Sequence, residues 1–231
     1  MTKAWLLALV IAVCPPGIAD TPKAREESPG KRFEHDMMVR FHMHQNFDLV
    51  RAIERLLIRG KLEDAQRFAE AIASAPDEPA HGPWAAQALV VRDRAQAVAR
   101  AISVDHALRK HTQLAAACAS CHRELDVTPM FQSLPPPPPD KPTIFARMAR
   151  HRWAADRLWE AVVGNSDEAW QDGLDVLAAA PIELGEDRAV FARNLQQLAN
   201  RARQTKRPIE DRATAYGEIL VTCAVCHAKT R

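Results

Sequence analysis

The chain has 231 residues, with 31 Lys and Arg against 29 Asp and Glu and a formal net charge of +2 at pH 7. This near balance gives no reason to expect a nucleic-acid partner, and we interpret the arginine-rich stretches 147–152 and 201–207 as solvated helix faces. Glycine occurs only 8 times, and no run of alternating β-branched residues is present. Length and composition therefore favour an all-α protein of one or two domains.

Residues 1–19 have the pattern of a secretory signal peptide. Lys3 supplies the positive charge, residues 5–13 are apolar, and residues 17–19 offer a small-residue cleavage site. The apolar stretch is too short to span a bilayer and no later segment has the length, so we expect a soluble, periplasmic or secreted protein without a transmembrane segment. Anchoring as a lipoprotein through Cys14 is the weaker alternative, because a valine precedes it where a small residue is usual.

Four helices are expected in the first half of the chain, residues 34–127, after an N-terminal extension over 20–33. Apolar residues recur with a period near 3.6, and Gly60 breaks this pattern. Ser103 is a suitable N-cap for the last of the four helices. The expected helices cover 34–59, 62–75 up to Pro76, about 83–102 with Pro83 in the first turn, and 103 to the cysteine motif described below.

A proline-rich segment over 128–142 separates the two halves. It contains five consecutive prolines, which cannot continue a helix and favour an extended, semi-rigid spacer. Four more helices are expected in the second half, residues 143–231. They cover 143–163, 167–180 up to Pro181, 186–205, and 209–228 after Pro208.

The two halves form a weak internal repeat. A shift of 105 residues superposes landmarks in order and without a gap. The superposed pairs are Met43 with Met148, Glu63 with Glu168, Gln66 with Gln171, Pro76 with Pro181, Cys118 with Cys223 and His122 with His227. We infer a duplicated unit and predict two tandem four-helix bundles.

Each half ends in a Cys-x-x-Cys-His motif, which is the attachment site of c-type haem. Two sulfurs at this spacing reach the two vinyl groups of the porphyrin, and the adjacent imidazole turns onto the iron. The residues are Cys118, Cys121 and His122 in the first half and Cys223, Cys226 and His227 in the second. A disulfide is one competing interpretation of each cysteine pair. A zinc site would require both motifs to meet in space, and a thioredoxin-like motif would need a βαβ context that is not apparent.

A four-helix bundle with the haem motif on its last helix resembles the class of c-type cytochromes that includes cytochrome c-prime. The resemblance implies two covalently bound haem c groups, proximal iron ligation by His122 and His227, and attachment outside the cytoplasm. Small globular cytochromes c differ, because their motif lies near the start of the domain and the second iron ligand follows far downstream. Only residues 228–231 follow His227 here, so we expect any second axial ligand upstream.

In this class the sixth coordination position of the iron faces the first helix of the bundle. At 100° per residue from Ile53, the centre of the apolar stripe, His42 lies about 20° away, Met43 about 80° and His44 about 180°, which faces water. We therefore predict His42 as a distal ligand of the first haem. Met43 and an open sixth position stay as alternatives.

The same phase argument in the second half starts from Leu158. His151 lies about 20° from this centre and Met148 about 80°. We predict His151 as the distal ligand of the second haem, with Met148 or no ligand as alternatives. We interpret the remaining histidines and large aromatic residues as surface or packing residues: His35, His81, His106, His111, Trp153, Trp159, Trp170 and Tyr216.

Electron transfer is the function that two ligated haems favour, with redox proteins as partners and the axial ligands tuning each potential. Gas binding or sensing is the alternative if one or both sixth positions are open. We do not expect an enzyme, because di-haem peroxidases resemble paired globular cytochrome c domains in a longer chain.

Overall fold

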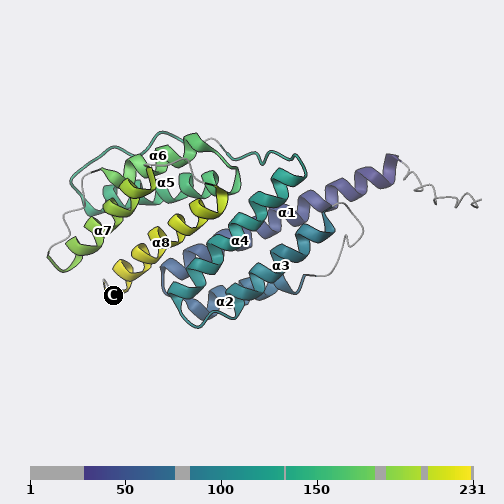
Figure 1. The fold of residues 1–231 in the computed structure, drawn as a ribbon, viewed down its shortest axis with the longest axis horizontal. Coiled ribbons are helices and arrows are strands. Elements are labelled where there is room, and N and C mark those ends of the chain that lie inside the picture. Colours follow the sequence, from purple (N-terminus) through teal and green to yellow (C-terminus); the bar gives the residue numbers. More distant parts are fainter. Residues whose placement is uncertain (1–28, 76–83, 133, 180–185, 204–207, 230–231) are drawn as a thin grey trace, which may run out of the picture. The chain divides into compact units, whose positions relative to one another are not determined.

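The computed structural model describes residues 29–75, 84–132, 134–179, 186–203 and 208–229 (Figure 1). The described residues divide between two units, one that ends at Met38 and one that begins at Val39. The described residues contain eight helices and no strand, which confirms the expected all-α fold. The helices are α1 (Pro29–Ile58), α2 (Leu62–Ala73), α3 (Ala85–Ala99), α4 (Val104–Glu124), α5 (Ile144–Val163), α6 (Asp167–Ala178), α7 (Glu186–Arg203) and α8 (Ile209–Ala228).

The helix ends agree with the sequence pattern, with one clear exception. Helix α1 begins at Pro29 rather than at residue 34, because a proline at the first helical position lacks only an N–H that would have no partner there. Ser103 caps α4 as expected, since its Oγ accepts a hydrogen bond from the His106 backbone N–H at 3.1 Å. The predicted break and start points at Pro76, Pro83 and Pro181 lie outside the described residues.

The proline-rich segment between α4 and α5 contacts α5. Trp153 Nε1 donates to the Pro135 carbonyl oxygen at 2.7 Å, and Arg150 donates from Nη1 to the Pro138 carbonyl oxygen at 2.6 Å. Carbonyl groups of consecutive prolines have no helical or sheet partner, so side-chain donors or water must satisfy them. These two donors hold the segment along the first part of α5.

Helices that follow one another pack together: α2 with α3, α3 with α4, α5 with α6, α6 with α7, and α7 with α8. Helix α4 also packs against α8, although the two lie in different halves of the chain. Arg109 Nη1 lies 4.0 Å from Glu218 Oε1, and Thr112 lies opposite Gly217, so residue numbers rise along α4 as they fall along α8. The two helices are therefore antiparallel, and their carboxyl ends point to opposite ends of the pair (Figure 1).

One hydrophobic core contains residues from both halves of the chain. Ile53 on α1 and Leu158 on α5, the predicted centres of the two apolar stripes, are both 0% exposed. Leu108 on α4 and Leu220 on α8 belong to the same core. Each buried side chain of this size contributes about 1.5–3 kcal/mol relative to exposure, so this core stabilises the packing of the two halves together.

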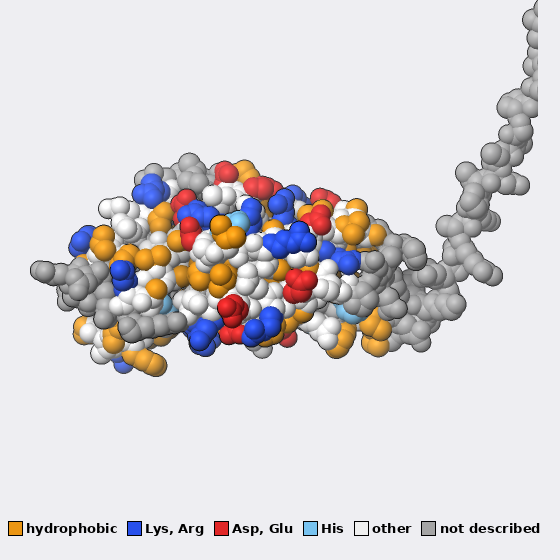
Figure 2. Space-filling view, turned by 90° about the horizontal axis from the view of Figure 1, so that it is seen from below, with side chains coloured by type: hydrophobic (Ala, Val, Ile, Leu, Met, Phe, Trp, Pro, Cys, Tyr) orange, Lys and Arg blue, Asp and Glu red, His pale blue; other side chains and the backbone are white. Residues whose placement is uncertain are grey.

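The surface carries both signs of charge. On the face shown in Figure 2, basic and acidic side chains are interspersed with small apolar areas. In the part of the chain that the structure describes, no helix combines the length and the apolar character that crossing a membrane requires.

Candidate haem sites

The first cysteine motif lies in the last turns of α4. Cys118 and Cys121 are three residues apart and therefore share one helix face, where both are partly buried. Burial raises the pKa of the Cys118 thiol to about 12. Burial, and secondarily the charge of Glu124, also raises the pKa of Cys121. Zinc binding and thiol redox chemistry require thiolates, whereas a thioether to haem is uncharged and suits this environment.

His122 follows directly on the same helix and is half-buried. Its Nδ1 is buried and has no hydrogen-bond partner among the described residues. Burial lowers the pKa of the His122 imidazole, and an opposing hydrogen bond with the Val163 backbone is the smaller effect. His122 therefore favours the neutral imidazole, which is the form in which histidine binds a metal.

The second motif occupies the equivalent position at the end of α8. Cys223, Cys226 and His227 are all partly buried. Burial raises the pKa of the Cys223 thiol to about 12, as it does for Cys118. The donor set is again two sulfurs on one helix face followed by an imidazole, which fits a covalently attached haem.

His151, on α5, lies within electrostatic range of His227. The pKa of His151 is lowered to about 4, mainly by burial, then by the charges of Arg150 and Arg147, and also by His227. His151 is therefore neutral near pH 7, the form in which an imidazole binds a metal. The predicted distal and proximal residues of the second half thus interact electrostatically.

Among the described residues, His42 and His122 of the first half show no comparable interaction. His42 is half-buried and packs edge-on against Phe41, with the ring centroids 6.0 Å apart. Met43 is 46% exposed, and His44 is exposed, as its helical phase predicts. Met148 in the second half is half-buried. A distal role for His42 stays a prediction.

The two motifs lie far apart. Thr112 and Gly217 mark the contact between α4 and α8, and His122 and His227 each follow ten residues later on their own helix. At a helical rise of 1.5 Å per residue, antiparallel helices place the two histidines about 30 Å apart. The motifs therefore cannot combine into one zinc site. Among the described residues, no three His, Cys, Asp or Glu side chains gather as a metal site, and Cys118, Cys121 and Cys223 form no disulfide.

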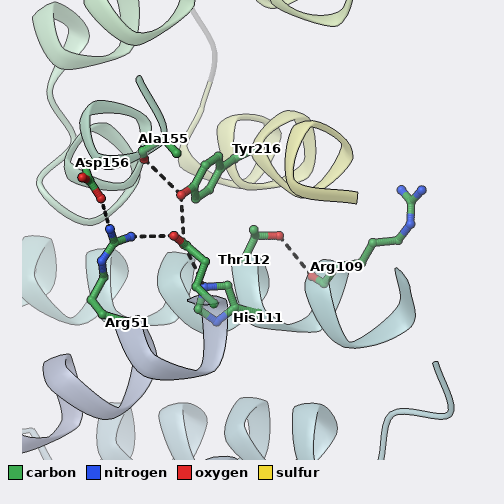
Figure 3. A network of polar contacts seen from close by, with 8 residues as sticks. Arg51, Arg109, His111, Thr112, Ala155, Asp156 and Tyr216 are labelled. Atoms are coloured by element: carbon green, nitrogen blue, oxygen red, sulfur yellow. Dashed lines mark hydrogen bonds and ion pairs between the residues drawn. The ribbon is translucent and has the colours of Figure 1, made fainter. Parts of the chain in front are cut away.

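A buried polar cluster at the centre of the molecule was not predicted from the sequence. We call it the central polar cluster; its members are Arg51, Glu54, His111, Asp156 and Tyr216 (Figure 3). Glu54 Oε2 accepts a hydrogen bond from the Tyr216 hydroxyl at 2.9 Å and lies 3.2 Å from His111 Nε2. Arg51 pairs with Glu54 Oε1 at 2.8 Å and also with Asp156.

The electrostatics of Glu54 explain how a charge can be buried there. Burial works to raise its pKa, but Arg51, His111 and Tyr216 together hold the pKa of Glu54 below its ordinary value. Burial, and then the charge of Glu54, raises the pKa of Tyr216, which keeps its hydroxyl a donor. A glutamate beside Ile53, inside the apolar stripe of α1, is the one local sign of this cluster in the sequence.

Comparison of the chain with models of protein families, with curated proteins and with solved structures gave no match.

Proposed function

We propose that the chain is an exported di-haem c-type cytochrome that transfers electrons. The observation that carries this proposal is the Cys-x-x-Cys-His motif, present twice and at the end of the closing helix of each half. The neutral, partly buried cysteine thiols and the lowered pKa of His122 support it. Residues 34–127 and 143–231 would each form a four-helix haem-binding bundle, joined by the linker 128–142.

The roles of the chain's residues follow from this proposal. Cys118 and Cys121 would hold the first haem through thioethers, with His122 as proximal ligand. The corresponding residues on α8 would hold the second haem in the same way. Bound haem c supplies reversible one-electron chemistry at its iron. The helices keep the ligands in place and exclude water, so that little has to reorganise when the charge changes.

The sixth ligand is proposed separately for each half. In the second half we propose His151, because it is neutral near pH 7 and interacts with His227. In the first half His42 is the proposed ligand on helical phase alone. Unequal sixth ligands would give the two haems unequal potentials.

The antiparallel packing of α4 and α8 supports two separate sites of electron exchange. The proximal histidines lie about 30 Å apart by helical rise. Electron tunnelling falls exponentially with distance, so each haem would exchange electrons mainly with redox partners that dock at its own end of the molecule. Direct transfer between the two haems would be slow by comparison.

Optical spectroscopy tests the proposal. The full chain, exported from cells that carry the haem-attachment machinery, should contain two covalent haems with low-spin spectra that carbon monoxide does not change. A high-spin haem that binds carbon monoxide would assign gas binding to that site instead. Absence of covalent haem would overturn the proposal.

A further inference from the structure

Two close contacts join residues that are equivalent in the 105-residue repeat. Arg51 on α1 pairs with Asp156 on α5, and these residues are 105 positions apart. Thr112 on α4 and Gly217 on α8 are equivalent in the same way, and a Cβ built on Gly217 would lie 2.9 Å from Thr112 Oγ1. In each case a position meets its own counterpart in the other half.

Such contacts are the signature of a two-fold axis. When two copies of one unit pack around a two-fold axis, a residue near the axis meets its equivalent, and each contact away from the axis occurs twice with the roles exchanged. The packing of α4 on α8 is consistent with a two-fold axis, because the two helices are equivalent in the repeat and antiparallel.

The contacts of Glu54 and Trp159, which are equivalent in the repeat, provide a test away from the axis. Glu54 contacts Tyr216 of the other half through a hydrogen bond of 2.9 Å. In the repeat, Glu54 corresponds to Trp159 and Tyr216 corresponds to His111. Two-fold symmetry therefore predicts a second contact, between Trp159 and His111. Trp159 and His111 are indeed in contact, with stacked rings whose centroids are 5.7 Å apart. The contact is kept although its chemistry differs.

We propose that the two halves pack as a pseudo-symmetric dimer within one chain, and that unlike residues at the axis make each half fit the other half rather than a second copy of itself. This inference concerns an interaction surface and does not depend on the proposed electron transfer. The surface is formed by α1 and α4 in the first half and by α5 and α8 in the second.

Charge explains the specificity at the pair Arg51 and Asp156, which lies at the two-fold axis. Two identical halves would place Arg against Arg or Asp against Asp, and like charges in a partly buried contact repel each other. Arg51 against Asp156 replaces this repulsion with attraction. Arg51 also lies over the Trp159 ring, 5.1 Å from its centroid, which ties the same side chain to the other half by a second contact.

Size explains the specificity at the pair Thr112 and Gly217, which also lies at the two-fold axis. A Cβ at position 217 would approach Thr112 Oγ1 to 2.9 Å and the Arg109 Cα to 3.6 Å, so only glycine lets α8 come this close. Two identical halves would place Thr against Thr and force the helices apart, or Gly against Gly and leave a gap. Threonine against glycine fills the space.

Exchanging the residues at positions 112 and 217 tests the inference. Gly217→Thr alone should lower the unfolding midpoint of the full chain by roughly 5 °C through overpacking, and Thr112→Gly alone should lower it through loss of packing. In the exchanged variant T112G/G217T the midpoint should return close to that of the wild type, because the two positions are equivalent. An exchanged variant that is no more stable than G217T would overturn the inference.

A tight glycine contact between non-equivalent positions provides the matched control. A Cβ on Gly173 would lie 2.8 Å from Leu158 Cγ, and the two residues are not related by the repeat. The exchange L158G/G173L should therefore not restore stability. If the threonine variant does not fold, Gly217→Ala with and without Thr112→Gly gives the same comparison.

The charge pair is tested by two substitutions at one position. Asp156→Arg places two arginines at the axis and should lower the midpoint more than the neutral variant Asp156→Asn. Equal midpoints for the two variants would overturn the role of charge in specificity. Both measurements use circular dichroism of the full chain and depend neither on haem nor on electron transfer, so their failure is distinct from failure of the proposed function.

Discussion

The centre of the molecule and its two ends are organised differently. At the centre, the central polar cluster takes residues from α1, α4, α5 and α8, so both halves contribute to one network. At the ends, each cysteine motif belongs to a single helix of one half. A substitution at the centre should therefore affect the stability of the whole fold, whereas a substitution at one end should affect only one proposed haem.

The two ends also differ from each other. Cys121, in the first motif, lies in the field of a carboxylate, Glu124. His151, beside the second motif, lies in the field of Arg147 and Arg150. Positive charge stabilises the reduced state of a nearby iron and negative charge the oxidised state. Under the proposed function, the second haem should therefore have the higher potential when the two irons have the same ligands.

The largest effect is expected at the centre, from Glu54→Ala. Loss of this carboxylate leaves Arg51, His111 and Tyr216 without their shared partner in a buried site. Removing one member of such a network typically costs about 3–5 kcal/mol. Urea unfolding of the full chain should show this loss, and both haem spectra should respond together. A change confined to one haem would contradict the distinction between centre and ends.

At one end, the double variant C118A/C121A should remove one of the two haems. The two positions carry the only thioether sulfurs of the first motif, so covalent haem per chain should fall by half while the spectrum of the second haem is unchanged. Haem content from the pyridine haemochrome measures this. C223A/C226A is the matched control and should spare the first haem. Loss of both haems in either variant would contradict the independence of the ends.

Much of the helical fold could be predicted because its signals are local. The Ser103 cap, the break at Gly60 and the helix start after Pro208 each depend on a few adjacent residues. The start of α1 at Pro29 was missed because no apolar stripe marks that turn. The central polar cluster was missed for another reason. Glu54 and Tyr216 are 162 residues apart, and only the packing of α8 onto α1 and α4 brings them together.

In the candidate sites, too, some features follow from local sequence and others depend on helix packing. Each motif is contiguous, so its residues and their helix face follow from the sequence alone. The exposure of His44 and the burial of Leu158 also follow, because helical phase fixes which side a residue faces. The pairing of His151 with His227 was predicted only through the resemblance to a known class, since it depends on how α5 crosses α8. The sequence also holds no sign that α4 and α8 are antiparallel.

A single ligand change is expected to have a smaller effect than loss of a haem. His151→Ala should convert the second haem from low spin to high spin and leave the first unchanged, because only the second would lose its sixth ligand. Optical spectra of the oxidised protein measure this, and His42→Ala is the corresponding change in the first half. An unchanged spectrum in H151A would shift the assignment to Met148.

Acid should weaken the centre through Glu54. Its pKa is lowered on folding, so its stabilising contribution is full above its ordinary pKa of 4.5 and is lost as the pH falls through the lower, folded value. Asp156 opposes this trend, because burial raises its pKa. Urea midpoints between pH 7 and pH 3 should fall less steeply for Glu54→Gln than for the wild type.

The smallest effect should come from the charges near the second motif. Arg150→Gln removes a positive charge from the field around His151, so the potential of the second haem should fall. A charge about 10 Å away in a mostly aqueous surrounding changes a one-electron free energy by about 0.5 kcal/mol. Arg150→Lys keeps the charge and should keep the potential, although it alters the hydrogen bond to Pro138. Equal shifts in R150Q and R150K would show that the contact with the linker, rather than the charge, sets the potential at this end.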